Sequence, residues 1–205
     1  MPLVLLIRHG ENEYVKKGRL AGRLPGVHLN ENGKQQAEIL AEKLKNAPVK
    51  AVYSSPLERT METAQPIAAA HNLEVVPRPG LMEIDFGDWT DKTLKSLRRR
   101  KLWKVVQGSP SLMRFPQGET FAEAQLRIAQ EIISLCAQHG KKDLLVCVSH
   151  SDSIKLAVAY FIGLPLDNFQ RLNVAPASIS GLMIGEQGSS LLSLNFNPQF
   201  SFERK

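Results

Sequence analysis

Short apolar runs without polar alternation are the first pattern along the chain. Runs of this length suit strands that are covered on both faces of a sheet. They are Leu3–Ile7, Ala51–Tyr53 and Leu144–Val148. Two later segments, Ser178–Ile184 and Ser190–Phe196, also read as strands and are separated by a turn around Gly185–Gly188.

Between these runs, apolar residues recur three or four positions apart, as on one face of a helix. The stripes are Ala37, Leu40, Ala41 and Leu44; then Phe121, Ala124, Ile128, Ile132 and Leu135; then Ile154, Ala157, Val158, Phe161 and Ile162. Each stripe can pack on a sheet. Strands that alternate with helices predict an α/β fold with helices on both faces of an open sheet.

One further helix has a predicted start and a predicted interruption. Ser55, Pro56 and Glu58 supply an N-cap, a proline at the first helical position and the acidic partner of a capping box. Pro66 follows about two turns later, and its missing N–H should kink or divide the helix.

The length of 205 residues fits one domain, or one domain with an insertion. The stretch 90–118 is the least regular and contains the basic run Arg98–Lys101, followed by Gly108 and Pro110. We therefore expect a single domain over residues 1–205, with a helical insertion or lid at about 90–118. The basic run is interpreted as a solvated helix face in preference to a lid that grips substrate.

Composition excludes several classes of protein. Hydrophobic residues make up 43% and charged residues 22%, which excludes disordered, collagen-like and coiled-coil chains. No apolar run approaches the roughly 20 residues that span a bilayer, and no basic segment precedes Leu3–Ile7 as in a signal peptide. We expect a soluble, cytoplasmic protein that does not bind membranes. Cys136 and Cys147 are then expected to be free, buried thiols. Phe196, Phe200 and Phe202 are expected to pack on the protein's own surface.

Net charge favours anionic ligands. The 26 basic residues against 20 acidic ones give +6 and a pI near 9.4. A phosphorylated metabolite and a nucleic acid both satisfy this condition. The sequence has no recognisable nucleic-acid-binding module and no aromatic stacking motif, so nucleic acid is not expected as a partner.

Polar residues that carry chemistry follow three of the predicted strands. They are Arg8, His9 and Gly10; Ser54–Arg59; and Ser149, His150 and Ser151. Ligands of open α/β sheets bind at the carboxyl ends of the strands. Two imidazoles and two guanidiniums at one such edge, near helix N-termini, would form a cationic pocket suited to a phosphoryl group.

Phosphoryl transfer needs an in-line nucleophile, stabilisation of the charged oxygens and a proton for the leaving oxygen. A neutral imidazole can be the nucleophile. Arg8 and Arg59 are placed to hold two phosphate oxygens each. Glu83 is flanked by apolar residues that could raise its pKa, which makes it a candidate acid, with Asp85 and Glu11 as open alternatives.

At this point the motifs resemble a known family. The block Leu6–Glu11, with its Arg-His-Gly triplet, is similar to the signature of the histidine phosphatase superfamily, whose best-known branch is the cofactor-dependent phosphoglycerate mutases. Further blocks follow in the family's order: Leu29–Ala37, Tyr53–Thr60 with Thr63 and Ala64, Glu83 with Phe86–Trp89, Pro116–Glu119, and Val148–His150. The resemblance implies a three-layer α/β/α sandwich with a mostly parallel central sheet.

The resemblance also implies roles for individual residues. His9 would be the nucleophile that becomes phosphohistidine. Arg8, Arg59 and His150 would hold the phosphoryl oxygens, and Glu83 would protonate the leaving alcohol and then activate water. It implies no metal and no other cofactor.

The chain departs from the family where many members have a Trp-Asn pair after the signature, with the Asn touching the phosphoryl group. Tyr14 and Val15 stand there instead, so Asn12 or the backbone near Gly22 is expected to supply the missing contact. The helix that follows is expected to use an Asn, at position 30, as its N-cap. A second anionic group on the substrate is expected to meet one of the loop's basic residues, which are Lys16, Lys17, Arg19 and Arg23.

The leading functional hypothesis is a phosphomonoesterase that acts on a small phosphorylated metabolite through a phosphohistidine. One alternative is a mutase that returns the phosphoryl group to a second oxygen and excludes water. About thirty residues separate the Glu83 block from Gly118, and this short insertion favours hydrolysis. The other alternative is a non-catalytic module that binds phosphorylated ligands. The oligomeric state and the identity of the substrate stay open.

Overall fold

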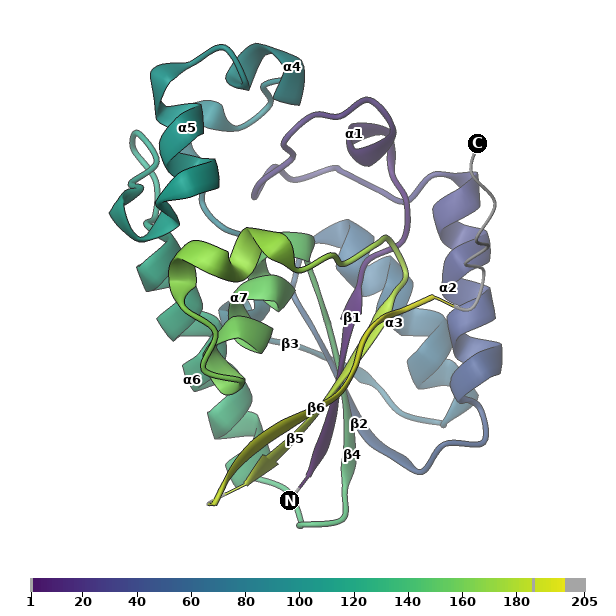
Figure 1. Ribbon diagram of the computed structural model, residues 1–205. Coiled ribbons are helices and arrows are strands. Elements are labelled where there is room, and N and C mark those ends of the chain that lie inside the picture. Colours follow the sequence, from purple (N-terminus) through teal and green to yellow (C-terminus); the bar gives the residue numbers. More distant parts are fainter. Residues whose placement is uncertain (1, 186, 198–205) are drawn as a thin grey trace.

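The computed structural model describes residues 2–185 and 187–197, and its centre is a six-stranded sheet (Figure 1). The strands are β1 (Leu3–Arg8), β2 (Val49–Ser54), β3 (Val75–Pro77), β4 (Leu144–Ser149), β5 (Ile179–Gly185) and β6 (Gly188–Phe196). Their order in the sheet is β3-β2-β4-β1-β5-β6. The pairs β1–β4, β2–β4 and β2–β3 are parallel, whereas β5 is antiparallel to both β1 and β6. The prediction of a mostly parallel sheet is confirmed.

Helices cover both faces of this sheet. The α-helices are α1 (Glu13–Lys16), α2 (Glu31–Leu44), α3 (Glu58–Ala70), α4 (Leu94–Leu97), α5 (Lys101–Gly108), α6 (Phe121–Ala137) and α7 (Ser151–Phe161). Short 3₁₀ segments are η1 (Pro79–Leu81), η2 (Gly87–Trp89), η3 (Pro110–Leu112) and η4 (Leu166–Arg171). Helices α2 and α3 lie on one face of the sheet, and α6 and α7 on the other (Figure 1). The three-layer α/β/α sandwich is therefore confirmed.

Side chains of the central strands alternate between two apolar cores. On β4, Leu145 and Cys147 pack with α6 and α7, whereas Val146 and Val148 pack with α2 and α3. All six residues of β4 are buried. A strand buried on both faces favours apolar residues without alternation, which explains the run from Leu144 to Val148. The last residue, Ser149, is polar, and its hydroxyl donates to the Leu81 carbonyl at 2.8 Å.

A third apolar cluster joins residues 90–118 to the top of the sandwich. Trp89, Leu97, Val106 and Phe115 pack with Phe121 at the start of α6. This packing places α4 and α5 above the carboxyl end of the sheet (Figure 1). The expected single domain over 1–205 stays a prediction.

The basic run Arg98–Lys101 is exposed to solvent, as the favoured interpretation required. Arg98–Arg100 form a turn between α4 and α5, however, and Lys101 is the first residue of α5. Leu97 is the buried residue just before this turn, so the apolar contact ends where the charged run begins.

The predicted start of α3 is wrong by two residues. The helix begins at Glu58, its N-cap is Leu57, and no side chain caps it. Ser55 belongs to the end of the strand instead, since its N–H donates to the Val148 carbonyl at 2.9 Å and its hydroxyl lies 2.9 Å from the His150 ring. The Glu58 carboxylate accepts instead from the Gly26 N–H at 2.9 Å.

Pro66 does not divide α3, which runs without interruption from Glu58 to Ala70. Removing a helical hydrogen bond at a proline costs about 3 kcal/mol or more. Ala64, Ile67 and Ala68, on both sides of the proline, are buried against the sheet. Their burial holds the two halves of the helix on one surface and offsets that cost.

The smaller predictions have mixed outcomes. Cys136 and Cys147 are both free thiols, and Cys147 is buried as expected, whereas Cys136 is only half-buried. Burial raises the pKa of the Cys136 thiol to about 11. Phe196 is 45% exposed, and Lys43 Nζ lies 5.6 Å from the centre of its ring, whereas Phe200 and Phe202 lie outside the described residues. Within those residues, no helix combines the length and apolar character needed to cross a bilayer. The cytoplasmic location stays a prediction.

Two glycines let the segment after β1 lie against the start of α2. A Cβ on Gly33 would come within 2.0 Å of the Glu11 carbonyl oxygen, and a Cβ on Gly10 within 2.6 Å of the Gly33 oxygen. The Asn30 side chain caps α2 by accepting from the Gly33 N–H at 2.8 Å, which confirms the predicted cap. The backbone that follows β1 is thus held by main-chain contact with α2.

We predict that Gly33→Ala lowers the free energy of unfolding by about 1–3 kcal/mol, because the added methyl group must push backbone away from backbone. Chemical denaturation measures this change. Gly108→Ala is the matched control, since its Cβ would meet nothing within 4 Å, and we expect it to be neutral or up to about 1 kcal/mol more stable. Equal stabilities of the two variants would contradict the close contact.

Candidate active site

The ends of β1 and β4 bring two histidines together. Arg8 is opposite Ser149 in the parallel pairing of these strands, and the His9 N–H donates to the Ser149 carbonyl at 3.0 Å. His9 and His150 are the next residues along each strand. Their rings lie edge to face, with centroids 5.3 Å apart. The predicted meeting of these two imidazoles is what the structure shows.

His9 is a neutral imidazole with a free lone pair. Its Nδ1 lies 2.7 Å from the Gly10 carbonyl oxygen. Because a carbonyl oxygen accepts only, Nδ1 carries the hydrogen and Nε2 keeps its lone pair. Burial, then the charges of Arg59 and Arg8, hold the pKa of His9 well below its usual range. The side chain lines the cavity described below, so Nε2 is available as a nucleophile.

His150 is held from both sides of its ring. The Arg59 guanidinium, which only donates, lies 3.3 Å from Nδ1, and Nε2 lies 2.9 Å from Ser55 Oγ. Nε2 therefore carries the hydrogen. Burial, then Arg59, holds the pKa of His150 well below its usual range. The residue is fully buried behind His9 and Arg59 and is not among the residues that line the cavity, so its contact with phosphoryl oxygens stays a prediction.

Both predicted arginines have donors without acceptors. Arg59 is 1% exposed; its Nη2 donates to the Gly22 carbonyl at 2.7 Å, while Nε and Nη1 are buried without a partner. Arg8 donates from Nη1 to the Val174 carbonyl at 2.7 Å, and its Nε is likewise buried without a partner. Neither forms an ion pair within the described residues. Buried donors of this kind are costly until an acceptor arrives, and both arginines line the same cavity as His9.

Glu83 is the carboxyl group beside these cations. It is 9% exposed, and one oxygen accepts from the Ile84 N–H at 3.0 Å and the Ser153 hydroxyl at 3.1 Å. Burial, then the charge of Asp152, raises the pKa of Glu83. The chain thus contains a carboxyl group that stays protonated to higher pH than usual and that lines the cavity.

The two alternative acids do not line the cavity. Asp85 accepts from the Gly87 N–H at 2.9 Å, and Glu11 accepts from the Asn30 side chain at 2.9 Å. Both carboxylates are therefore engaged in holding turns. The geometry favours Glu83 over either of them.

The cavity has a volume of about 340 Å³. Its polar lining includes Asn12, Tyr14, Arg19, Gln107, Asp152 and Gln170. Its apolar lining includes Leu20, Leu94, Trp103, Val106, Phe115 and Phe121. The loop after β1, the N-terminus of α7 and the 90–118 segment thus all contribute walls. The predicted binding residues at positions 12, 19 and 22 lie here, and their binding roles stay predictions.

Arg19 is the one basic residue of its loop that lines the cavity. Its Nη2 donates to the carbonyl and carboxylate oxygens of Asp91 at 2.6 and 2.7 Å, and its guanidinium lies 5.9 Å from the centre of the Tyr14 ring. Its Nε is buried without a partner. Lys17 pairs on the surface with Glu13 at 3.1 Å. Of the four basic residues considered, Arg19 is thus the one placed to meet a ligand.

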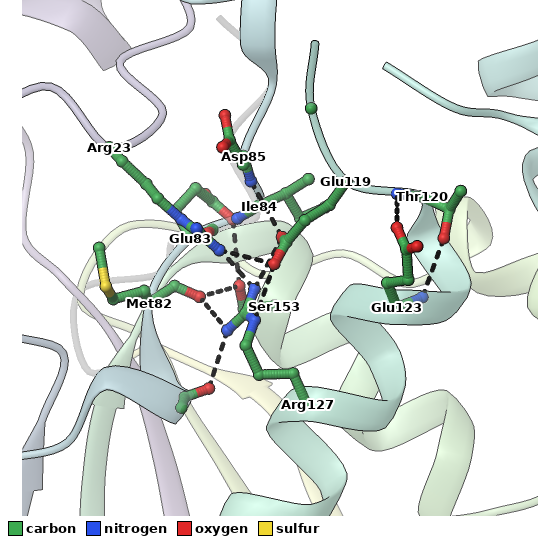
Figure 2. Close-up of polar contacts among 12 residues, drawn as sticks. Arg23, Met82, Glu83, Ile84, Asp85, Glu119, Thr120, Glu123, Arg127 and Ser153 are labelled. Carbon is green, nitrogen blue, oxygen red and sulfur yellow. Dashed lines mark hydrogen bonds and ion pairs between the residues drawn. The ribbon is translucent and has the colours of Figure 1, made fainter. Parts of the chain in front are cut away.

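Several residues that support the site were not anticipated. Ser55 was interpreted as a cap, yet its hydroxyl binds the ring of His150. Ser153 bonds the Glu83 carboxyl from the first turn of α7 (Figure 2). Arg127, on α6, contacts the backbone around Glu83 (Figure 2). Nothing in the apolar pattern of α6 distinguishes Arg127 from the other polar positions of that helix.

Candidate metal ligands do not gather in the described part of the chain, where no group of three or more His, Cys, Asp or Glu side chains is placed to hold an ion. The expectation that the protein uses no metal stays a prediction. The positive charge in the cavity comes instead from Arg8, Arg59 and Arg19.

Known proteins with similar sequences are phosphatases and mutases. The chain is 31% identical over 197 residues to phosphoserine phosphatase 1 of Hydrogenobacter thermophilus, covering 95% of this chain and 92% of the relative. It is 32% identical over 186 residues to the 2,3-bisphosphoglycerate-dependent phosphoglycerate mutase of Thermoplasma acidophilum, covering 88% and 86%.

Solved structures agree with the sequence relatives. The phosphoserine phosphatase of Entamoeba histolytica in complex with 3-phosphoglyceric acid matches with a TM-score of 0.88 and 30% identity, over 97% of this chain and 98% of that chain. The model of the histidine phosphatase superfamily (branch 1) matches residues 4–197. The motifs, the paired histidines and this match together show that the chain belongs to the histidine phosphatase superfamily.

Proposed function

We propose that this protein hydrolyses small phosphomonoesters through a phosphohistidine formed on His9. One observation carries the proposal: a neutral imidazole with a free Nε2 shares a cavity with unpartnered donors of Arg8 and Arg59 and with the Glu83 carboxyl. Nucleophile, anion clamp and proton donor are then present together. The family match and the phosphatases among the relatives support the same activity.

In the first step, the phosphoryl group sits against Arg8 and Arg59, whose free N–H groups meet its oxygens. His9 Nε2 attacks the phosphorus as the ester P–O bond breaks. Glu83, kept protonated by burial, gives its proton to the leaving alkoxide. The products are an alcohol, a phosphohistidine and the Glu83 carboxylate.

In the second step, the Glu83 carboxylate takes a proton from a water molecule that attacks the phosphorus. The P–N bond breaks, and its electron pair returns to His9 Nε2. Inorganic phosphate leaves, and both His9 and Glu83 regain their starting protonation states. His150 holds Arg59 in place through the contact between Nδ1 and Nη2.

Mutase activity is the second candidate, because phosphoglycerate mutases are among the relatives. It requires that a second hydroxyl of the bound molecule take the phosphoryl group before water does. Release of inorganic phosphate from 3-phosphoglycerate, measured beside its conversion to 2-phosphoglycerate, separates the two activities. Hydrolysis predicts that phosphate release dominates.

We infer further that the substrate carries a carboxylate near its phosphate. The buried, unpartnered Nε of Arg19 is a further charged donor in the same cavity, beside the Arg8 and Arg59 donors that are assigned to the phosphoryl group. Phosphoserine and 3-phosphoglycerate, which are bound in structures of the similar Entamoeba histolytica phosphoserine phosphatase, have such a group. A carboxylate oxygen would satisfy this donor.

We predict that His9→Ala abolishes the phosphoenzyme and lowers kcat by about 10³-fold or more, because the attacking nitrogen is gone. Acid-quenched labelling with a ³²P-labelled substrate detects the intermediate. His28→Ala is the control, since His28 is exposed and pairs with Glu62, and it should label like the unaltered protein. Full turnover by His9→Ala without labelling would overturn the mechanism, and binding without turnover by the unaltered protein would favour a non-catalytic module.

We predict that Glu83→Gln lowers kcat on an alkyl phosphate about 10²- to 10⁴-fold. Because the acid form must be present, the rate of the unaltered enzyme falls as pH rises through the raised pKa of Glu83. On the acidic side, the rate falls only below the usual pKa range of histidine, because His9 must be neutral to attack and its pKa is lowered. Glu83→Gln should lose the alkaline decline in a pH profile of kcat.

Asp85→Asn is the control for this experiment, since an amide oxygen can still accept from the Gly87 N–H. We expect it to keep both the rate and the alkaline decline. A larger loss in Asp85→Asn than in Glu83→Gln would reverse the assignment of the acid.

We predict that Arg19→Gln raises KM for phosphoserine about tenfold, which corresponds to about 1.4 kcal/mol, and changes KM for phosphoethanolamine less than threefold. Phosphoethanolamine lacks the carboxylate and so makes no use of the Arg19 Nε. Steady-state phosphate release with both substrates gives the comparison. Equal changes of KM for the two substrates would show that Arg19 does not bind the carboxylate of the substrate.

A further inference from the structure

The segment that carries Glu83 has no regular structure of its own. Residues 82–86 lie between η1 and η2, outside any helix or strand. Arg127, which projects from α6, donates from Nη1 to the carbonyls of Gly80 at 2.9 Å and Met82 at 3.0 Å. Its Nη2 lies 3.4 Å from the Glu83 carbonyl (Figure 2). One guanidinium therefore contacts three carbonyl groups of this stretch.

Glu119 orients that guanidinium. Its two oxygens accept from Arg127 Nε at 3.1 Å and Nη2 at 3.0 Å, the paired geometry that fixes a guanidinium in its plane. One oxygen also accepts from the Asp85 N–H at 3.0 Å. Burial acts to raise the pKa of Glu119, but the hydrogen bonds from Arg127 and Asp85 outweigh it and the pKa is lowered. Glu119 is thus a carboxylate that contacts both Arg127 and the backbone two residues beyond Glu83.

Arg23 completes the network from the opposite side. Its Nε donates to the Glu83 carbonyl at 2.8 Å and its Nη2 to the Glu119 carboxylate at 2.8 Å (Figure 2). The preceding residue, Gly22, accepts from Arg59 through its carbonyl. The same short loop therefore contacts the backbone of the acid and one arginine of the phosphate site.

We propose that Glu119, with Arg127 and Arg23, is a positioning residue for Glu83: the network sets where the Glu83 carboxyl stands relative to His9 and Arg59. None of the three lines the cavity, so each acts through the backbone of the acid. Ion pairs with partial burial contribute little net stability against the cost of desolvation. Their fixed geometry, in contrast, suits a group that must meet the leaving oxygen closely, since a displacement of about 1 Å can cost 10²-fold in rate.

This inference rests on the proposed function, and the leaving group of the substrate provides its test. An alkoxide needs the proton of Glu83, whereas p-nitrophenolate leaves without one. In Glu119→Gln, one carboxylate oxygen that accepts hydrogen bonds is replaced by an amide NH₂ group, which cannot accept from the N–H donors around it. We expect kcat on phosphoserine to fall about tenfold with KM changed less than twofold. The burst of p-nitrophenol, which reports phosphorylation of His9, should keep its rate within twofold.

Glu123→Gln is the matched control. Glu123 lies on the first turn of α6, four residues from Glu119, and bonds Thr120 and the exposed Arg114, away from the Glu83 segment (Figure 2). A Gln oxygen can still accept from the Thr120 N–H. We expect both substrates to react as with the unaltered enzyme.

A double variant separates positioning from a general effect on folding. If Glu119 acts through Glu83, then Glu119→Gln adds no loss of kcat in a Glu83→Gln background. Additive losses, or an equal fall in the p-nitrophenol burst, would overturn the proposal. Should Glu119→Gln not fold, Arg23→Lys tests the same point, because a lysine cannot contact the Glu83 carbonyl and Glu119 in that planar geometry.

The two proposals fail in different ways. Absence of a burst and of a labelled phosphohistidine in the unaltered protein would reject the proposed function. A normal burst and label, with phosphoserine turnover unchanged in Glu119→Gln, would reject the positioning role alone.

Discussion

Two guanidiniums without a carboxylate partner, that of the buried Arg59 and that of the half-buried Arg8, are the constraint on which the site depends. Arg8 and Arg59 leave three nitrogen atoms without acceptors at the cavity, and neither forms an ion pair within the described residues. Their charges help to lower the pKa of His9 and His150, which keeps both rings neutral. The same field attracts an anion to the place where the His9 lone pair is free. Anion affinity and nucleophile activation thus have one physical origin.

The central sheet and the helices that cover it could be predicted from the sequence, because burial determines which of their positions are apolar. A strand covered on both faces is mostly apolar, as β4 is from Leu144 to Val148. Parallel strands end at one edge of the sheet, and so His9 and His150 meet. Strand β3 was not anticipated, since it has three residues, none of them buried. The start of α3 was misplaced because a Ser-Pro-x-Glu pattern also suits a strand end whose serine serves another side chain.

The contacts that hold the Glu83 segment could not be predicted from the sequence, for a different physical reason. Glu83 is recognisable as a carboxyl among apolar neighbours, but its support comes from Arg23, Glu119 and Arg127, which are far apart in sequence. Polar pairs of this kind leave no periodicity. The Pro116–Glu119 block was visible as a motif, yet its purpose depends on the backbone carbonyls that it helps to orient, and these have no sequence signature. The position of His150 behind Arg59 is likewise a matter of three-dimensional packing.

The register of β1 against β4 determines which changes of sequence these two strands can tolerate. Leu3 pairs with Leu144 and each following residue with its counterpart, up to Arg8 and Ser149. This alignment is made by peptide groups, so one aliphatic side chain can replace another in either strand without altering the spacing of the two imidazoles. A single inserted residue, in contrast, would turn one imidazole to the opposite face of the sheet. Sequence can thus drift widely within these strands while their lengths stay fixed.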